Sequence, residues 1–327
     1  MAIKDLLDEI EKDVKDMKSL NFEYSSTNSV PSRHDNSFTF ESGKDKTGKT
    51  LESCVLYVDI RNSVDLNKKH HTQTMGRIYS IFSKSMLKVA KYHSGAVRNI
   101  IGDRVMIVFP SKDCFTNAVD CAISIYHVSE YLINKVFSDV DFKCGIGIDY
   151  GELNIVKVGI RRVGTENFDN KNLVWAGYPA NVASRLTDVA NKEIDNTKIK
   201  VTYYPYDFSS FGGIGSILGI KPKTPSKIYQ DYTTTKLHNH EDFSKALSFN
   251  ETLGVCYSGG KLVKFEKIEN KIKYPPILMS EEVFKGFKAA NPNRNSIKNN
   301  YWEEVSNEGV KNITSKVFGG TINWVIK

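Results

Sequence analysis

The sequence has few cysteines and no cysteine pair of the kind that binds metals. Its 327 residues include five cysteines, an odd number without a C-x-x-C motif. Most of them lie inside apolar runs, which is typical of buried thiols in a reducing compartment. We therefore expect neither a disulfide scaffold nor a zinc site, and a chain of this length can bury a core without either.

Long hydrophobic runs and a strong charge imbalance are also absent. No stretch approaches the roughly 18 consecutive apolar residues that span a bilayer, and residues 1–20 are too acidic and too interrupted for a signal peptide. Lys and Arg total 45 against 38 Asp and Glu, a net charge of +7, which suits a polyanionic ligand but not a nucleic-acid-binding protein. We expect a cytoplasmic protein without a membrane or nucleic-acid partner.

Residues 1–50 divide into a helix and an arm. Apolar residues recur at helical spacing between positions 3 and 20, with Lys, Asp and Glu between them, which predicts an amphipathic helix. This helix either docks on its own domain or forms a dimer contact. Residues 24–50 are rich in Ser, Thr, Asn, Gly and Lys and have little periodicity, which indicates a linker or an irregular arm.

Residues 51–194 carry the sharpest secondary-structure pattern. In order, it predicts a strand at 54–60, a helix at 75–89, a hairpin around Gly102 and Asp103, a helix at 115–125 and a strand at 142–149. This order is the ferredoxin-like βαββαβ arrangement of the α+β class, with helices covering one face of an antiparallel sheet.

The remaining chain adds to this core. We expect further strands at 152–160 and 172–177 and a helix from about residue 179 to 191, with proline in its first turn. Residues 195–273 are polar and resemble an insertion of unknown role. The pattern of residues 274–327 predicts a strand, a helix and a closing strand pair, which would complete the core domain.

Two aspartates form the first candidate site. Asp59 ends the first central strand and Asp103 lies at the hairpin tip, two points that this topology can bring together. No basic residue at fixed spacing pairs with them, so holding both carboxylates together is costly unless a divalent cation neutralises them. Each residue alone could simply serve a turn, but the pair in this topology favours a metal site.

Two further groups suit a phosphate or a ribose. Arg61 and Ser63 precede a helical stretch whose backbone N–H groups can meet phosphate oxygens; a solvated turn is the simpler alternative. Asn181 and Arg185 are four residues apart on a predicted helix and share a face. An amide beside a fixed positive charge suits a ribose next to a reacting phosphate, although a solvent-facing polar stripe gives the same pattern.

At this point the sequence resembles a known family, the class III nucleotidyl cyclases. The motifs VLYVDIRNS, NIIGDRVMIVF, GIGIDYG and GYPANVASRL stand in the family's order and approximate spacing, and their combination is specific. The resemblance covers about 51–191 and 274–327. It implies in-line attack of a ribose 3′-OH on the α-phosphate of a nucleoside triphosphate, with loss of pyrophosphate.

The resemblance also implies a homodimer with active sites at the interface. One subunit would hold two Mg²⁺ or Mn²⁺ ions through Asp59, Asp103 and the carbonyl oxygen of Ile60. The other subunit would supply Asn181 and Arg185, with the arginine stabilising charge that develops in the transition state.

Departures from the family pattern bear on the substrate. Purine cyclases of this family read the base edge with a charged pair, and the matching positions here hold Asn99 and Val174, with Trp175 beside the second. A smaller pocket with a neutral amide suits a pyrimidine better than a purine, because unpaired base-edge groups penalise the wrong ligand.

The sequence is also similar to the pyrimidine cyclases of Pycsar anti-phage defence through SVPSRHDNSFTFE, VRNIIGDRVM and VWAGYPANVAS. This similarity implies synthesis of cyclic UMP or cyclic CMP on infection and a separate effector protein that reads the product. Overall similarity favours UTP over CTP. The alternatives are an adenylate or guanylate cyclase with an unusual base pocket and a catalytically silent nucleotide-binding dimer.

Overall fold

The computed structural model describes residues 2–41, 43–159, 171–206, 229–251 and 254–326. The chain divides into two compact units. The first contains residues 1–192 and 273–327, and the second contains residues 193–272. The boundaries of the second unit lie within two residues of those of the segment 195–273, whose polar composition predicts an insertion.

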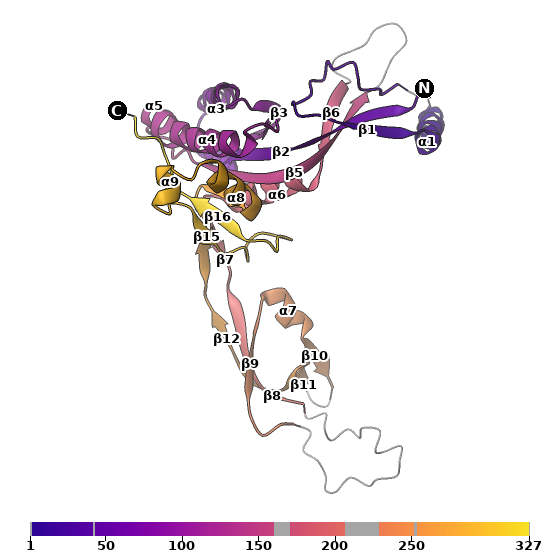
Figure 1. Cartoon of the computed structure of the whole chain (residues 1–327). Helices are drawn as coiled ribbons and strands as arrows, with labels where there is room; N and C mark the ends of the chain where they lie inside the picture. Colours follow the sequence, from indigo (N-terminus) through magenta and orange to yellow (C-terminus); the bar gives the residue numbers. More distant parts are fainter. Residues whose placement is uncertain (1, 42, 160–170, 207–228, 252–253, 327) are drawn as a thin grey trace. The chain divides into compact units, whose positions relative to one another are not determined.

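The first unit is built on one mixed β-sheet (Figure 1). Its strands follow the order β15-β16-β14-β5-β2-β4-β3, with β1 also paired to β2 and β6 paired to β5. The strands are β1 (Phe22–Ser26), β2 (Lys46–Ile60), β3 (Ala96–Ile101), β4 (Arg104–Val108), β5 (Cys144–Gly159), β6 (Lys171–Ala176), β14 (Ile277–Ser280), β15 (Glu303–Val305) and β16 (Val317–Gly320).

The helices of this unit are α1 (Ile3–Ser19), α2 (Ser63–Lys69), α3 (Thr72–Tyr92), α4 (Cys114–His127), the π-helix η1 (Val128–Ile133), α5 (Asn134–Val136), α6 (Tyr178–Val189), α8 (Glu281–Ala290) and α9 (Asn295–Lys298). The order β2, α3, β3, β4, α4, β5 confirms the expected βαββαβ arrangement. Among the described helices, none is both long and apolar enough to cross a membrane.

The predicted boundaries are wrong for two sets of strands in the core. β5 runs through Gly151 as one strand instead of two, because it pairs with the long strand β2 from Cys144 to Ile155. The closing strand pair consists of β15 and β16, so the sequence after Gly320 does not add its own strand within the described residues. In both cases pairing with a distant strand, which local sequence does not encode, sets the boundaries.

Helices cover both faces of the sheet, not one face as expected. α3, α4 and α8 pack on one face through a large core that includes Phe82, Ile125 and Phe287. α6 packs on the other face, where Ala180 and Ala183 join a second core. These two small residues lie one helical turn apart, so the helix can approach the strands closely.

The arm before β2 is more ordered than the irregular segment expected. β1 pairs in parallel with the start of β2, and Phe38 is buried in the core beneath α6. Lys49 of β2 donates to Asp35 at 2.6 Å, and this hydrogen bond is the main reason that the pKa of Asp35 falls to about 2. These contacts hold the intervening residues against the sheet.

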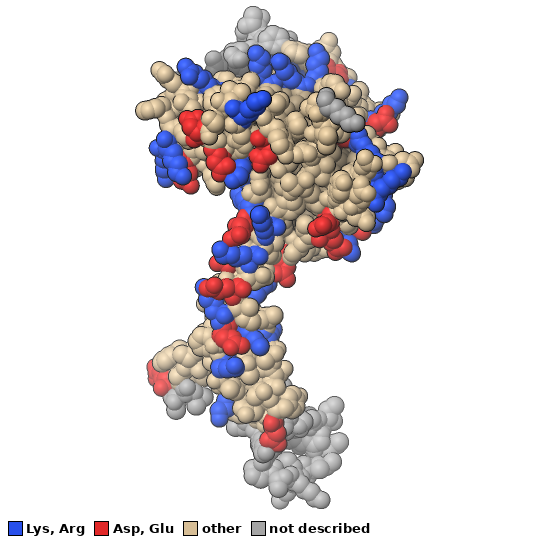
Figure 2. Space-filling model, turned by 90° about the vertical axis from the view of Figure 1, so that its left-hand side faces the viewer, with Lys and Arg blue, Asp and Glu red and all other residues tan. Residues whose placement is uncertain are grey.

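The second unit has its own sheet, in the order β10-β11-β12-β8-β9. Its elements are β7 (Glu193–Asp195), β8 (Lys198–Pro205), β9 (Thr234–His238), α7 (His240–Lys245), β10 (Leu247–Asn250), β11 (Gly254–Tyr257), β12 (Gly260–Ile268) and β13 (Lys271–Lys273), where β13 pairs with β7. Val201, Phe243 and Tyr257 form a small core. Acidic and basic side chains are mixed on its surface (Figure 2), as in the 3.6 Å pair between Lys200 and Glu266.

The close contact between α6 and β5 depends on a glycine. A methyl group at Gly147 would lie 2.3 Å from the carbonyl oxygen of Ala183 and 2.5 Å from the amide nitrogen of Thr187. Both neighbours are backbone atoms of α6, so only movement of the whole helix could relieve the clash.

We predict that Gly147→Ala lowers the free energy of unfolding by about 1–3 kcal/mol, the usual cost of overpacking a core. Urea unfolding followed by circular dichroism measures the change. The matched control is Gly76→Ala in α3, where an added methyl group meets nothing within 4 Å and where alanine favours the helix. Equal stability of the Gly147 variant and the wild type would contradict this account of the packing.

Candidate active site

The polar residues at the end of β2 lie on the face of the sheet that carries α6. Asp59 directly opposes Arg104 of β4 and Gly145 of β5. Directly opposed residues share a face, as do residues two positions apart on one strand. Because Gly147 contacts α6, Gly145, Asp59 and Arg104 face the same helix.

Arg104 connects Asp59 to α6. Its guanidinium donates to Asp59 Oδ2 at 3.0 Å and to Asp188 Oδ1 at 2.5 Å, and it donates to Ser184 Oγ at 2.9 Å. Burial alone would lower the pKa of Arg104, but the hydrogen bonds that it donates to Asp188 and Asp59 outweigh burial and raise the pKa. The expectation that no basic residue pairs with the aspartates is therefore wrong.

Sequence reasoning missed Arg104 although a signal was present. The residue follows Asp103 directly, so in a hairpin paired with the first strand it must come opposite the end of that strand. Only the register of β2 against β4 identifies Asp59 as its partner, and that register is not visible in the local sequence.

Asp103 and Ile60 complete the expected metal ligands. Asp103 lies in the turn between β3 and β4, next to the residue that opposes Asp59, so both carboxylates lie at one end of the sheet. Ile60 ends β2 opposite Cys144, with its side chain in the core. Carboxylate and carbonyl oxygens are ligands that suit Mg²⁺ and Mn²⁺, so the donor set fits a divalent cation.

A cation here would take its other ligands from outside this pair of carboxylates. No group of three His, Cys, Asp or Glu side chains with metal-binding geometry occurs among the described residues. Mg²⁺ commonly binds one or two carboxylates and completes its shell with water and substrate phosphates. The site therefore fits a cation that binds together with a nucleotide.

Arg61 does not fit the expected phosphate-binding role. Its side chain is only 3% exposed and donates to the carbonyl oxygen of Thr187 at 2.8 Å, at the C-terminal end of α6. The absent side chain of Gly145 leaves room for the guanidinium, and burial lowers the pKa of Arg61. Its charge favours the negative end of the helix dipole. Ser63, in contrast, is half-buried at the start of α2.

The two candidate residues on α6 lie on the helix face that also carries Asp188. Asn181 is exposed near the N-terminal end of the helix. Arg185 is half-buried and donates to the carbonyl oxygen of Asn312 at 3.4 Å. Seven residues separate Asn181 from Asp188, which is about 10 Å along a helix. Asn181 therefore lies well away from Asp188 along the helix, and Ser184, which accepts a hydrogen bond from Arg104, lies between them.

A β-bulge decides where Asn99 points. The register of β3 against β4 shifts between Val97 and Asn99, so that Asn99 opposes Met106. Met106 belongs to the core beneath α6. Since opposed residues share a face, the bulge places Asn99 on the same face as Asp59. Bulges often aim side chains in this way near functional sites.

Asn99 and Trp175 line one hollow of about 460 Å³. Trp175 opposes Ile155, a residue of the core beneath α6, whereas Val174 opposes Val156 on the other face. Of the two residues next to each other in β6, Trp175 is therefore the one that lines the hollow, and Val174 faces away from it.

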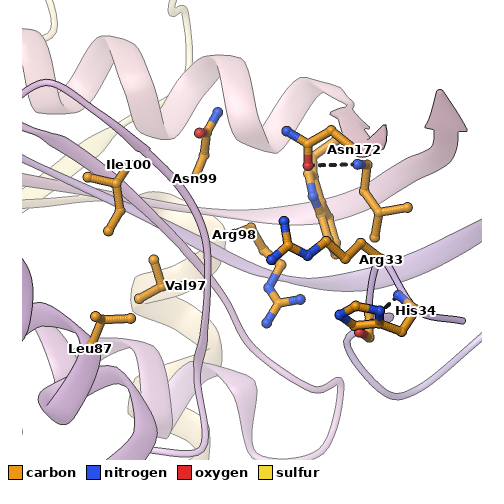
Figure 3. A pocket seen from close by; sticks show the side chains of 11 residues that line it. Arg33, His34, Leu87, Val97, Arg98, Asn99, Ile100 and Asn172 are labelled. Carbon is orange, nitrogen blue, oxygen red and sulfur yellow. Dashed lines mark hydrogen bonds between the residues drawn. The ribbon is translucent and has the colours of Figure 1, made fainter. Parts of the chain in front are cut away.

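Two arginines that the sequence reasoning missed line the same hollow. Figure 3 shows Arg33 reaching in from the arm and Arg98 from β3, with Leu87, Val97 and Ile100 on the other side. Arg98 donates to the carbonyl oxygen of Pro31 at 3.0 Å and lies 5.9 Å from the centre of the Trp175 ring. Burial lowers the pKa of Arg98. The arm thus forms one wall of the hollow.

Comparison with a protein-family model identifies the domain. Residues 46–212 match the adenylate and guanylate cyclase catalytic domain. A protein from Burkholderia cepacia named uridylate cyclase is 30% identical over 192 residues, which cover 57% of this chain and 79% of that protein. A uridylate cyclase from Gulbenkiania mobilis is 27% identical over 205 residues, covering 59% and 74% of the two chains.

Solved structures of cyclases are also similar. The adenylyl cyclase CyaB from P. aeruginosa gives a TM-score of 0.44 at 12% identity, covering 83% of this chain and 94% of that chain. A class III adenylyl cyclase-like ATP-binding protein from Pseudomonas aeruginosa gives a TM-score of 0.46 at 17% identity, covering 59% and 42%. The family-model match spans more than half of the chain, and the chain belongs to the adenylate and guanylate cyclase catalytic domain family, as a class III nucleotidyl cyclase.

Proposed function

We propose that the chain is a homodimeric uridylate cyclase, which converts UTP to 3′,5′-cyclic UMP and pyrophosphate. The relatives named uridylate cyclase support this substrate. The observation that carries the proposal within this chain is the hollow lined by Asn99, Trp175, Arg33 and Arg98. Its polar groups suit a pyrimidine base.

The donor and acceptor pattern of the hollow favours uracil over cytosine. An arginine side chain only donates hydrogen bonds, whereas the amide of Asn99 both donates and accepts. Uracil presents the acceptor O4 where cytosine presents an amino donor. An arginine of the hollow that faces position 4 of the base would therefore pair with uracil but meet a donor in cytosine. The face of Trp175 offers a stacking surface for either base.

The proposed site forms between two subunits. Asp59 and Asp103 of one subunit would hold two Mg²⁺ or Mn²⁺ ions, and Asn181 and Arg185 would come from the other. The exposure of Asn181 leaves its amide accessible to a second subunit, which supports this division. Bound divalent cations would neutralise the phosphates and favour deprotonation of the 3′-hydroxyl.

The side chains of Asn181 and Arg185 would orient the substrate and stabilise the transition state. The amide of Asn181 would bind the ribose and hold the 3′-oxygen in line with the α-phosphorus. The guanidinium of Arg185 would donate to oxygens of the α-phosphate, where negative charge grows as the new P–O bond forms and pyrophosphate departs. The half-buried position of Arg185 strengthens this interaction relative to one in open water.

We further propose that cyclic UMP acts as a second messenger in antiviral defence and that a separate effector protein binds it. The similarity of three sequence segments to the pyrimidine cyclases of Pycsar defence supports this role. The concentration of cyclic UMP in expressing cells, measured before and during phage infection, should rise on infection; a constant level would argue against the role.

The first prediction concerns the substrate. Purified protein with Mn²⁺ and each of ATP, GTP, CTP and UTP should yield mainly cyclic UMP, identified by mass spectrometry. Arg33→Gln should raise the ratio of cyclic CMP to cyclic UMP about tenfold, because a glutamine can accept from the cytosine amino group. Lys44→Gln, an exposed position elsewhere on the arm, is the control. Cyclic AMP or cyclic GMP as the main product would overturn the proposal.

The second prediction concerns the shared site. Asp59→Ala and Arg185→Ala should each abolish turnover, and an equal mixture should recover about one quarter of the wild-type activity, because half of the dimers are mixed and each mixed dimer has one intact site. Asp59→Ala mixed with Asp103→Ala is the control and should stay inactive, since both changes fall in the same half-site. No recovery in the first mixture would mean that the residues act within one chain.

The third prediction concerns the competition between Arg104 and a cation for Asp59. Arg104→Gln should tighten binding of Mn²⁺ about fivefold, since a partly buried ion pair is worth about 1 kcal/mol. Electron paramagnetic resonance of free Mn²⁺ measures the binding. The control is Lys143→Gln, which removes an equal charge from a surface pair with Asp141. Unchanged or weaker binding in the Arg104 variant would contradict the competition.

A further inference from the structure

The amphipathic helix α1 (Ile3–Ser19) has no buried residue within its own chain. Its apolar side chains remain largely exposed, at 70% for Ile3, 57% for Leu7, 47% for Ile10, 63% for Val14 and 52% for Met17. A continuous exposed apolar stripe of this kind usually marks a contact with a partner. The expected alternative, docking of the helix on its own domain, does not occur.

The spacing of the stripe is that of a coiled coil. Ile3, Leu7, Ile10, Val14 and Met17 follow one another at intervals of four, three, four and three residues. Their mean spacing of 3.5 residues corresponds to alternating d and a positions of a heptad. The outer b, c and f positions hold only charged or polar residues, namely Asp5, Asp8, Glu9, Lys12, Lys15, Asp16 and Ser19.

The charges of α1 argue against a membrane as its partner. The helix contains six acidic residues and four lysines, a net charge of 4 − 6 = −2. Helices that lie on membranes carry an excess of Lys and Arg, because the lipid surface is negative. The stripe therefore fits a protein surface of the same shape better than a lipid surface.

We propose that α1 pairs with α1 of a second copy of this chain as a parallel, in-register two-stranded coiled coil. In this arrangement all five stripe residues meet their counterparts. In an antiparallel pair an a residue packs against a d residue, so the three d and two a positions would leave one stripe residue of each helix unmatched.

Charge complementarity at the edge of the stripe also favours the parallel pair. Asp13 occupies a g position and Lys18 the following e position. In a parallel coiled coil these two positions face each other across the interface, so each helix pair gains two oppositely charged contacts. Glu11, at the other e position of this region, is already paired with Lys15 of its own helix at 2.5 Å.

The α1 contact is separate from the proposed catalytic interface, but it joins the same two chains and so reinforces that dimer. A helix of 17 residues is short for independent pairing. Two copies held by a catalytic interface, however, meet at a high effective concentration, and the two contacts then strengthen each other. Leu at a with Ile at d favours larger bundles, whereas Val14 at the other a position favours a pair, so the mass of the assembly is part of the test.

Disulfide trapping tests the geometry in the full-length protein. Cys256 is the half-buried cysteine among the described residues, and the other four are buried, so Cys256→Ser provides the background. Val14→Cys, at an a position, should form a disulfide-linked dimer at least tenfold faster than Lys12→Cys on the outer face. Equal rates, or no link at Val14, would overturn the parallel pair, because an antiparallel pair separates the two Val14 residues by about 16 Å of helix.

Association measurements complete the test. Ile10→Glu should weaken dimerisation about tenfold in sedimentation equilibrium without changing the circular dichroism of the core, because α1 does not pack on that core. Asp13→Lys should weaken it less, and the double change Asp13→Lys with Lys18→Asp should restore it. The proposal would be overturned if Ile10→Glu left dimerisation unchanged. It would also be overturned if the wild type were a tetramer that substitutions in α1 abolish, or if the wild-type protein bound anionic vesicles through α1.

Discussion

The close approach of α6 to β5 is the constraint on which the site depends. Gly147 lets the backbone of the helix contact the strand, and Gly145 leaves space for the Arg61 guanidinium beneath the end of the helix. One helix thereby brings Ser184 and Asp188 within hydrogen-bond distance of Arg104. A bulkier residue at Gly147 would displace the helix and separate these groups, because the nearest atoms there belong to the helix backbone.

Two arginines balance the charge of Asp59 at the end of β2. Arg104 and Arg61 lie 3.0 and 3.6 Å from its carboxylate, which offsets the cost of partial burial. Asp188 and Ser184 give Arg104 alternative partners on α6. A cation that displaces Arg104 from Asp59 therefore leaves the guanidinium bonded, so the exchange costs less than breaking an isolated ion pair.

The sequence predicts the order of the core elements because each is short, local and strongly patterned. It does not reveal the face of the sheet on which a helix packs, so the position of α6 on the second face could not be predicted. Asn99 and Asp59 could be proposed as site residues from their motifs, but the bulge that puts Asn99 on the α6 face depends on the register with β4. Arg61 fits a surface turn by sequence, and only the space at Gly145 makes it a buried contact.

The arm shows most clearly how a weak sequence pattern can carry a specific role. It lacks helical or strand periodicity between 27 and 45, yet Phe38 buries its ring and Asp35 pairs with Lys49, so the segment between β1 and β2 is held against the sheet. That tether brings Arg33 to the hollow. Since α1 precedes the same tether, pairing of two α1 helices would also restrain the arms. The proposed dimer contact and the proposed base specificity thus share one segment of the chain.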